Sequence, residues 1–184
     1  MKRLILLLTL SLAAAVDGQT TNAPRTYFEA FNATPDALLI KGSTTIATLN
    51  NQINYPVEIR AERLTNPQTT NSVYAVSLRT TFPQLIQVDY VDYDELDALI
   101  RSVQFISQAN STITPLDNFE VVFRTRSGLS VAKLGRGNKV IIAITSGNTN
   151  IVVHNQIPSF VLDELGRDLT AAKAKLDLAA ASGQ

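Results

Sequence analysis

A single amphipathic helix in the middle of the chain, flanked on both sides by strand-like segments, most constrains the fold. Its apolar residues recur at steps of three and four, which places on one helix face Leu96, Leu99, Ile100, Val103 and Ile106. A polar stretch after Ala109, followed by Pro115, predicts where the helix ends. A helix between two β-rich halves is typical of an α+β domain.

The start of this helix is rich in acidic residues. Asp92 is positioned as its N-cap, with Glu95 three residues on as the capping-box partner. The alternative is a calcium site, because hard cations bind several carboxylate oxygens. Its candidate ligands are Asp92, Asp94, Glu95 and Asp97, with Asp89 just before them. The spacing does not match an EF-hand loop and lacks its glycine, which favours the capped helix.

Strand-like runs precede the helix. Residues 37–41 and 44–49 are separated by Gly42-Ser43, which predicts a hairpin. Residues 57–62 and 73–82 alternate apolar and polar side chains, as half-buried strands do. In residues 85–90 the apolar positions Ile86, Val88 and Tyr90 alternate with Gln87 and Asp89, so we expect Asp89 on the polar face.

Four further strands and a second helix are predicted after the central helix. Residues 119–124, 129–134, 140–145 and 151–154 are separated by short turns, which favours an antiparallel meander. The C-terminal helix begins near Ser159, and its apolar positions are Leu162, Leu165, Leu169, Ala172 and Leu176. Gly166 lies inside this helix and weakens it by about 1 kcal/mol relative to alanine.

These elements predict an α+β fold with one or more curled antiparallel sheets of about eight strands, a central amphipathic helix and a C-terminal helix. The helices are expected to pack on one face or at the open end of the curled sheet. Residues 37–180 form a single domain in this interpretation. Residues 19–36 precede it as a flexible or loosely docked segment.

The first eighteen residues have the features of a signal peptide. Lys2 and Arg3 precede an apolar run, residues 4–15, which is too short for a typical membrane span. Small residues follow, so cleavage is expected between Ala15 and Gly18. The sequence therefore predicts an exported protein, periplasmic or secreted, with no membrane span in the mature chain.

Composition excludes several classes of chemistry. The chain has no cysteine, which excludes disulfides, thiolate catalysis and cysteine metal sites, and favours a bacterial over a eukaryotic exported protein. Its one histidine, His154, cannot form a histidine cluster and is expected at a strand end. Without residues 1–18, fourteen basic and fifteen acidic residues remain, which gives no argument for a nucleic-acid partner. No cofactor is predicted.

Five basic residues gather within a short stretch of predicted strands. They are Arg124, Arg126, Lys133, Arg136 and Lys139. One interpretation is a binding patch for an anionic ligand; the other is a solvated sheet face with acids paired across strands. Gly135-Arg136-Gly137 lacks the third glycine and the following helix of a phosphate-binding loop, so a hairpin turn is favoured there.

Several short motifs resemble a family of uncharacterised exported bacterial proteins. They are residues 92–97 (DYDELD), Phe105-Ile106-Ser107, Asn118-Phe119-Glu120, Arg124-Thr125-Arg126 and residues 172–176 (AKAKL). The resemblance covers roughly residues 37–180. The family has no assigned activity, so the resemblance implies export and a bacterial source but no catalytic residue.

Three functions remain open from the sequence. The first is a non-enzymatic module that binds an envelope ligand or protein through a sheet face or a cavity. The second is a carboxylate-dependent hydrolase, which requires a cleft with two acids and one raised pKa. The third is a structural subunit assembled through strand edges, which predicts a stable oligomer.

Overall fold

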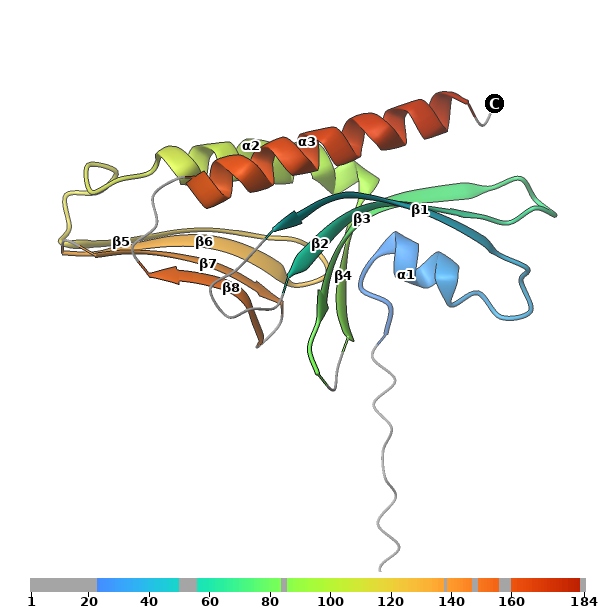
Figure 1. The fold of residues 1–184 in the computed structure, drawn as a ribbon, viewed down its shortest axis with the longest axis horizontal. Helices are drawn as coiled ribbons and strands as arrows, with labels where there is room; N and C mark the ends of the chain where they lie inside the picture. Colours follow the sequence, from blue (N-terminus) through green and yellow to red (C-terminus); the bar gives the residue numbers. More distant parts are fainter. Residues whose placement is uncertain are drawn as a thin grey trace, which may run out of the picture.

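The chain folds into two antiparallel sheets that share a layer of helices (Figure 1). The computed structural model describes residues 23–49, 56–83, 86–137, 139–146, 149–155 and 160–182, the range 149–155 in backbone only. The predicted signal peptide lies outside the described residues. No helix within these ranges combines the length and apolar character needed to cross a membrane.

The first sheet comes entirely from the segment before the central helix. Its strand order follows the chain: β1 (Ile40–Leu49), β2 (Val57–Thr65), β3 (Ser72–Thr81) and β4 (Ile86–Asp92). Every neighbouring pair is antiparallel. β1 runs without interruption through Gly42 and Ser43, so the predicted hairpin at these residues is wrong. The irregularity in β1 is instead a shift of register between Thr45 and Ala47.

The second sheet is the predicted meander. It has the order β5 (Asn118–Arg124), β6 (Leu129–Arg136), β7 (Lys139–Ser146) and β8 (Thr149–Asn155). Side chains are described in seven strands, four in the first sheet and three in the second, while β8 is described in backbone alone. His154 lies next to the end of β8, as predicted, and its side chain is outside the described residues.

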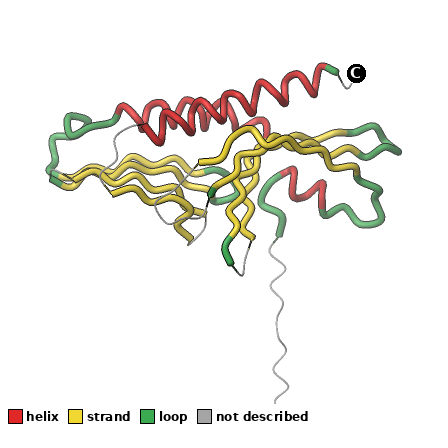
Figure 2. Tube along the Cα trace, viewed as in Figure 1, coloured by secondary structure: helices red, strands yellow, loops and turns green. Residues whose placement is uncertain are grey.

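Two long helices lie side by side over the sheets (Figure 2). A single 3₁₀ turn, η1 (Tyr93–Glu95), leads from β4 into α2 (Leu96–Gln108), and α3 (Phe160–Ala181) ends the described chain. α2 packs against β5 and β6, and α3 packs against β1, β2 and β3. Both predicted helices are confirmed, including their buried faces.

One hydrophobic core joins both sheets to the helices. Its members come from the inner faces of all three, including Ile59 of β2, Val131 of β6, Leu99 of α2 and Leu169 of α3. Each of these side chains is at most 1% exposed. The α+β class and the single continuous core are therefore established for the described part of the chain.

The prediction of a curled sheet is wrong. The strands form two separate sheets, because β4 leads into η1 and α2 and does not pair with β5. Alternation along a strand identifies its two faces but not its neighbour, so the sequence pattern was compatible with one sheet or two.

A short helix covers the other face of the first sheet. α1 (Tyr27–Asn32) lies in the segment predicted to be flexible or loosely docked and was not predicted as a helix. Phe28 is buried there with Leu64 and Ala75, and its ring stacks on Tyr90 at a centroid distance of 4.8 Å. Because α1 and α3 lie on opposite faces, the central strands of this sheet are buried on both sides (Figure 1).

Replacing Gly166 by alanine is expected to stabilise the protein by about 0.5–1 kcal/mol, because alanine loses less backbone entropy in a helix. A Cβ at this position would meet Val103 Cγ1 at 3.6 Å, which is an ordinary contact. Urea unfolding followed by circular dichroism measures the change. A lower unfolding free energy would mean that the α2–α3 contact does not accept the methyl group.

Candidate functional site

A polar pocket lies where β4, β7, the β5–β6 turn, α1 and the segment before α1 meet. Its volume is about 410 Å³. The polar and charged side chains that line it are Arg25, Glu29, Gln87, Asp89, Ser127 and Ser146. These residues come from distant parts of the chain, so the pocket exists only in the folded protein.

The central side chain of this pocket is Asp89. It is buried at 6% exposure and lies opposite Leu78, on the core face of the first sheet. The Ser146 hydroxyl donates to its Oδ1 atom. Oδ2 is buried and accepts no hydrogen bond among the described residues. Within the described part of the chain, Asp89 therefore keeps one acceptor atom unsatisfied, which is costly in a buried position.

Burial raises the pKa of Asp89. The negative charge of Glu29 raises it further, whereas the Ser146 hydrogen bond, Arg25 and the Gln87 amide lower it. Gln87 is near enough to favour the charged form, but its own hydrogen bond goes to the Ser146 carbonyl, at 3.5 Å. The net result is a carboxyl group that is protonated more readily than an exposed aspartate.

The expected polar placement of Asp89 is wrong. Ile86, assigned to the apolar face, is 51% exposed, and Asp89, assigned to the polar face, is buried. The reason is that β4 is covered on both faces, by α1 around Tyr90 and by the main core around Val91. In a strand covered on both faces, alternation no longer separates buried from exposed side chains.

The pocket is held together by contacts of the segment before α1. Arg25 Nη1 donates to the Ser127 carbonyl at 3.0 Å, which ties this segment to the β5–β6 turn. Glu29 accepts from the backbone N–H groups of Arg25 and Thr26, at 2.7 and 3.2 Å. Thr26 in turn accepts from the Glu29 N–H, which completes a capping box at α1.

The predicted helix cap at Asp92 is wrong, because Asp92 caps a different helix. Its carboxylate accepts from the N–H groups of Tyr27 and Phe28 of α1, at 2.8 and 3.0 Å. Neither η1 nor α2 has a side-chain cap. Glu95 also has another role, since its Oε1 accepts from the Arg126 N–H at 2.9 Å. A carboxylate at the N-terminus of α1 also suits the helix dipole.

The acidic residues proposed as metal ligands surround an arginine instead. Arg126 pairs with Asp94, with Glu95 at 3.3 Å and with Asp92 at 3.8 Å. Asp97 lies 3.8 Å from Lys173 of α3. No group of three or more metal-ligating side chains gathers among the described residues. Asp89 and Asp92 point to opposite faces of β4, so they cannot share one ion.

The five predicted basic residues are not brought together as one patch. Arg126 is in the acidic cluster just described. Lys133 is buried at 8% exposure, and its Nζ donates to the Ser107 carbonyl of α2 at 2.7 Å. Burial lowers the pKa of Lys133, and the charge of Asp163 opposes this only in part.

The other three basic residues are exposed on the outer face of the second sheet. Arg136 and Lys139 are cross-strand partners at one end of the sheet. Arg124 pairs with Ser130 at the other end of the same strands, about 20 Å away at 3.3 Å per residue. A single ligand held by all five residues would therefore have to reach three separate places, and a ligand role for the exposed three stays a prediction.

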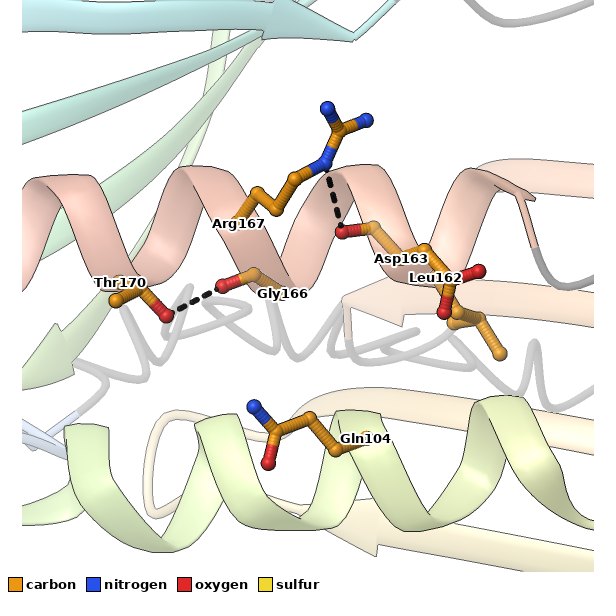
Figure 3. A pocket seen from close by; sticks show the side chains of 6 residues that line it. All are labelled: Gln104, Leu162, Asp163, Gly166, Arg167 and Thr170. Carbon is orange, nitrogen blue, oxygen red and sulfur yellow. Dashed lines mark hydrogen bonds between the residues drawn. The ribbon is translucent and has the colours of Figure 1, made fainter.

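A second pocket, of about 360 Å³, lies between α2 and α3 (Figure 3). The hydrogen bonds drawn there stay within α3: Thr170 donates to the Gly166 carbonyl at 2.7 Å and Arg167 to the Asp163 carbonyl at 3.4 Å. Gln104 faces them from α2. Because Thr170 and Arg167 already donate to backbone carbonyls of α3, this pocket is the weaker candidate for a ligand site.

The Asp89 pocket was only partly visible in the sequence. Asp89 was considered as a calcium ligand, and Ser146, Arg25 and Gln87 had no distinguishing pattern. Comparison with known proteins adds no information about the site, since no family model, no curated protein and no solved structure matches the chain.

Proposed function

We propose that the protein is an exported bacterial envelope protein that binds a small ligand with a cationic N–H group in the Asp89 pocket. The observation that carries the proposal is the buried Asp89 Oδ2, which accepts no hydrogen bond among the described residues. A protonated amine supplies both the missing donor and a compensating charge. Export and a bacterial source rest on the signal-peptide pattern and on the family resemblance.

Other features of the pocket fit such a ligand. A volume of about 410 Å³ suits a small molecule. Glu29 adds a second carboxylate to the lining. Arg25 adds a guanidinium group, with which a carboxylate of the same ligand would form an ion pair. A ligand that carries both an amine and a carboxylate therefore matches the lining best.

Replacing Asp89 by asparagine is expected to remove amine binding and to stabilise the empty protein by about 1 kcal/mol, because no charge is then buried. Asparagine still accepts from Ser146. Thermal unfolding with amino acids and alkyl diamines as probes measures both effects. Asp117→Asn, at an exposed position, is the matched control and is expected to change neither.

The pH dependence follows from the raised pKa of Asp89. The folded state prefers the protonated form, so this group stabilises the fold at low pH, and its contribution is lost as the pH rises through the folded pKa. Asp89→Asn is expected to remove this slope. A cationic probe binds the ionised form and is expected to bind more weakly as the pH falls.

Native mass spectrometry of the protein purified from its own envelope, without chelator, tests the proposal directly. A small bound molecule that is absent from Asp89→Asn is the expected result. Wild-type protein that carries no added mass, and shows no thermal shift with any amine probe, would contradict it.

A second candidate, a carboxylate-dependent hydrolase, is favoured by one observation. Asp89 and Glu29 line the same pocket, and Asp89 has the raised pKa that a general acid needs. In that case Asp89→Asn would retain ligand binding and lose turnover. The loss of binding expected above distinguishes the two functions.

A further inference from the structure

β5 is an edge strand that lacks several common forms of edge protection. Among the described residues it pairs only with β6, and this pairing is regular from Asn118 to Arg124. Of the two edge strands of the other sheet, β1 has a register shift between Thr45 and Ala47, whereas β4 pairs regularly with β3. Natural proteins protect exposed edges with bulges, prolines or charged side chains, lysine above all. β5 has no bulge, proline or lysine, and its two charged residues, Glu120 and Arg124, are of opposite sign.

An apolar groove of about 410 Å³ runs beside this edge, between β5 and α2. Val121 and Phe123 of β5 form one wall, and Phe105 and Arg101 of α2 are in the other. The Phe105 side chain is 58% exposed. The unpaired edge of β5 therefore lies next to an apolar surface. A second strand that paired with β5 would cover this surface with its side chains.

We propose that β5 pairs antiparallel with β5 of a second copy of this chain, with Val122 on the two-fold axis. In this register Glu120 lies opposite Arg124 of the second copy, and the same pair recurs on the other side of the axis. Val121 lies opposite Phe123 of the second copy, next to the groove. The β5–β8 sheets of the two copies then join into one continuous sheet. The interface is isologous, since both copies use the same strand.

Charge complementarity selects both the occupant and the register. Glu120 and Arg124 are exposed, and neither forms an ion pair with another described residue. Moving the axis to Val121 would place Glu120 opposite Val122 and leave both charges unpaired. Moving it by half a residue either way also separates them. Opposite charges directly across antiparallel strands stabilise the pairing, and like charges oppose it.

Charge reversal tests the proposal. Sedimentation velocity over the micromolar range is expected to show a dimer of the mature protein. Glu120→Arg and Arg124→Glu should each weaken the dimer by roughly tenfold or more, because each places like charges together twice. The double variant E120R/R124E restores both pairs and should restore the dimer. A monomeric wild type, or a double variant no better than the single ones, would overturn the proposal.

Because the chain has no cysteine, one introduced thiol gives a second, independent test. In the proposed dimer, Val122→Cys faces its own copy at the short distance that a disulfide requires. Mild oxidation is expected to give a covalent dimer in non-reducing electrophoresis. Ile86→Cys is the matched control, since Ile86 is exposed on β4, one of the two edge strands of the other sheet. Crosslinking of Ile86→Cys without that of Val122→Cys would refute the β5 interface.

Discussion

Replacing Asp92 by alanine is expected to lower the unfolding free energy by about 3 kcal/mol, because it removes a buried charged acceptor from two backbone N–H groups. The Asp92 side chain is buried, and it accepts from two amides of α1 and faces Arg126. Its loss leaves the first amides of α1 without acceptors and removes a counter-charge. Urea unfolding measures the change.

The control for this prediction is Asp94→Ala. Asp94 also pairs with Arg126, but its side chain is 60% exposed. Exposed ion pairs contribute at most about 1 kcal/mol, so this variant is expected to lose far less. Equal losses in the two variants would mean that the cap on α1 contributes little and that only the charge near Arg126 matters.

The loss of Asp92 is also expected to affect the Asp89 pocket, because Asp92 anchors α1 and the segment before it. The segment supplies Arg25 to the pocket lining, and α1 supplies Glu29. We therefore expect Asp92→Ala to weaken amine binding even at temperatures where the protein is fully folded. Amide hydrogen exchange of residues 23–32 reports the release of the segment directly.

Replacing Leu169 by alanine is expected to cost about 3 kcal/mol, within the usual range for a fully buried leucine. Leu169 is 0% exposed and belongs to the core that joins both sheets to α2 and α3. Since that core is continuous, peptides from β2 and from β6 should lose hydrogen-exchange protection together.

Leu178→Ala in the same helix is the matched control. Leu178 is 69% exposed, so its truncation is expected to change the unfolding free energy by no more than about 0.5 kcal/mol. If Leu169→Ala reduced protection in the first sheet alone, the two sheets would be separate folding units, contrary to the single core.

The acidic start of the central helix illustrates how sequence and structure differ here. The pattern around Asp92 and Glu95 is typical of a local cap, and a local cap is what the sequence predicts. In the folded protein the N-terminus of α1 donates to Asp92, and the backbone N–H of Arg126, in the β5–β6 turn, donates to Glu95. Contacts between residues about 65 and 31 positions apart leave no periodic signal in the chain.

The basic residues also show that closeness along the chain does not place side chains together, even on one strand. Lys133 was grouped with its neighbours by sequence distance, yet strand alternation places it on the core face, where it bonds to the Ser107 carbonyl. Lys133 lies two residues after Val131 on the same strand. Strand alternation therefore places both side chains on one face, the face that enters the core. Grouping residues by charge and by distance along the chain ignores this alternation.

The sequence by itself determined what depends on neighbours along the chain. Both long helices, the meander after α2 and the buried face of each helix follow from periodicity, because one face of every element must leave water. Only the tertiary structure decided that there are two sheets, that Asp92 caps α1, and that Asp89 meets Ser146 in a pocket. Those features arise where segments distant in the sequence pack together. Their geometry depends on which faces of the helices and strands come into contact, and the local sequence pattern does not specify this.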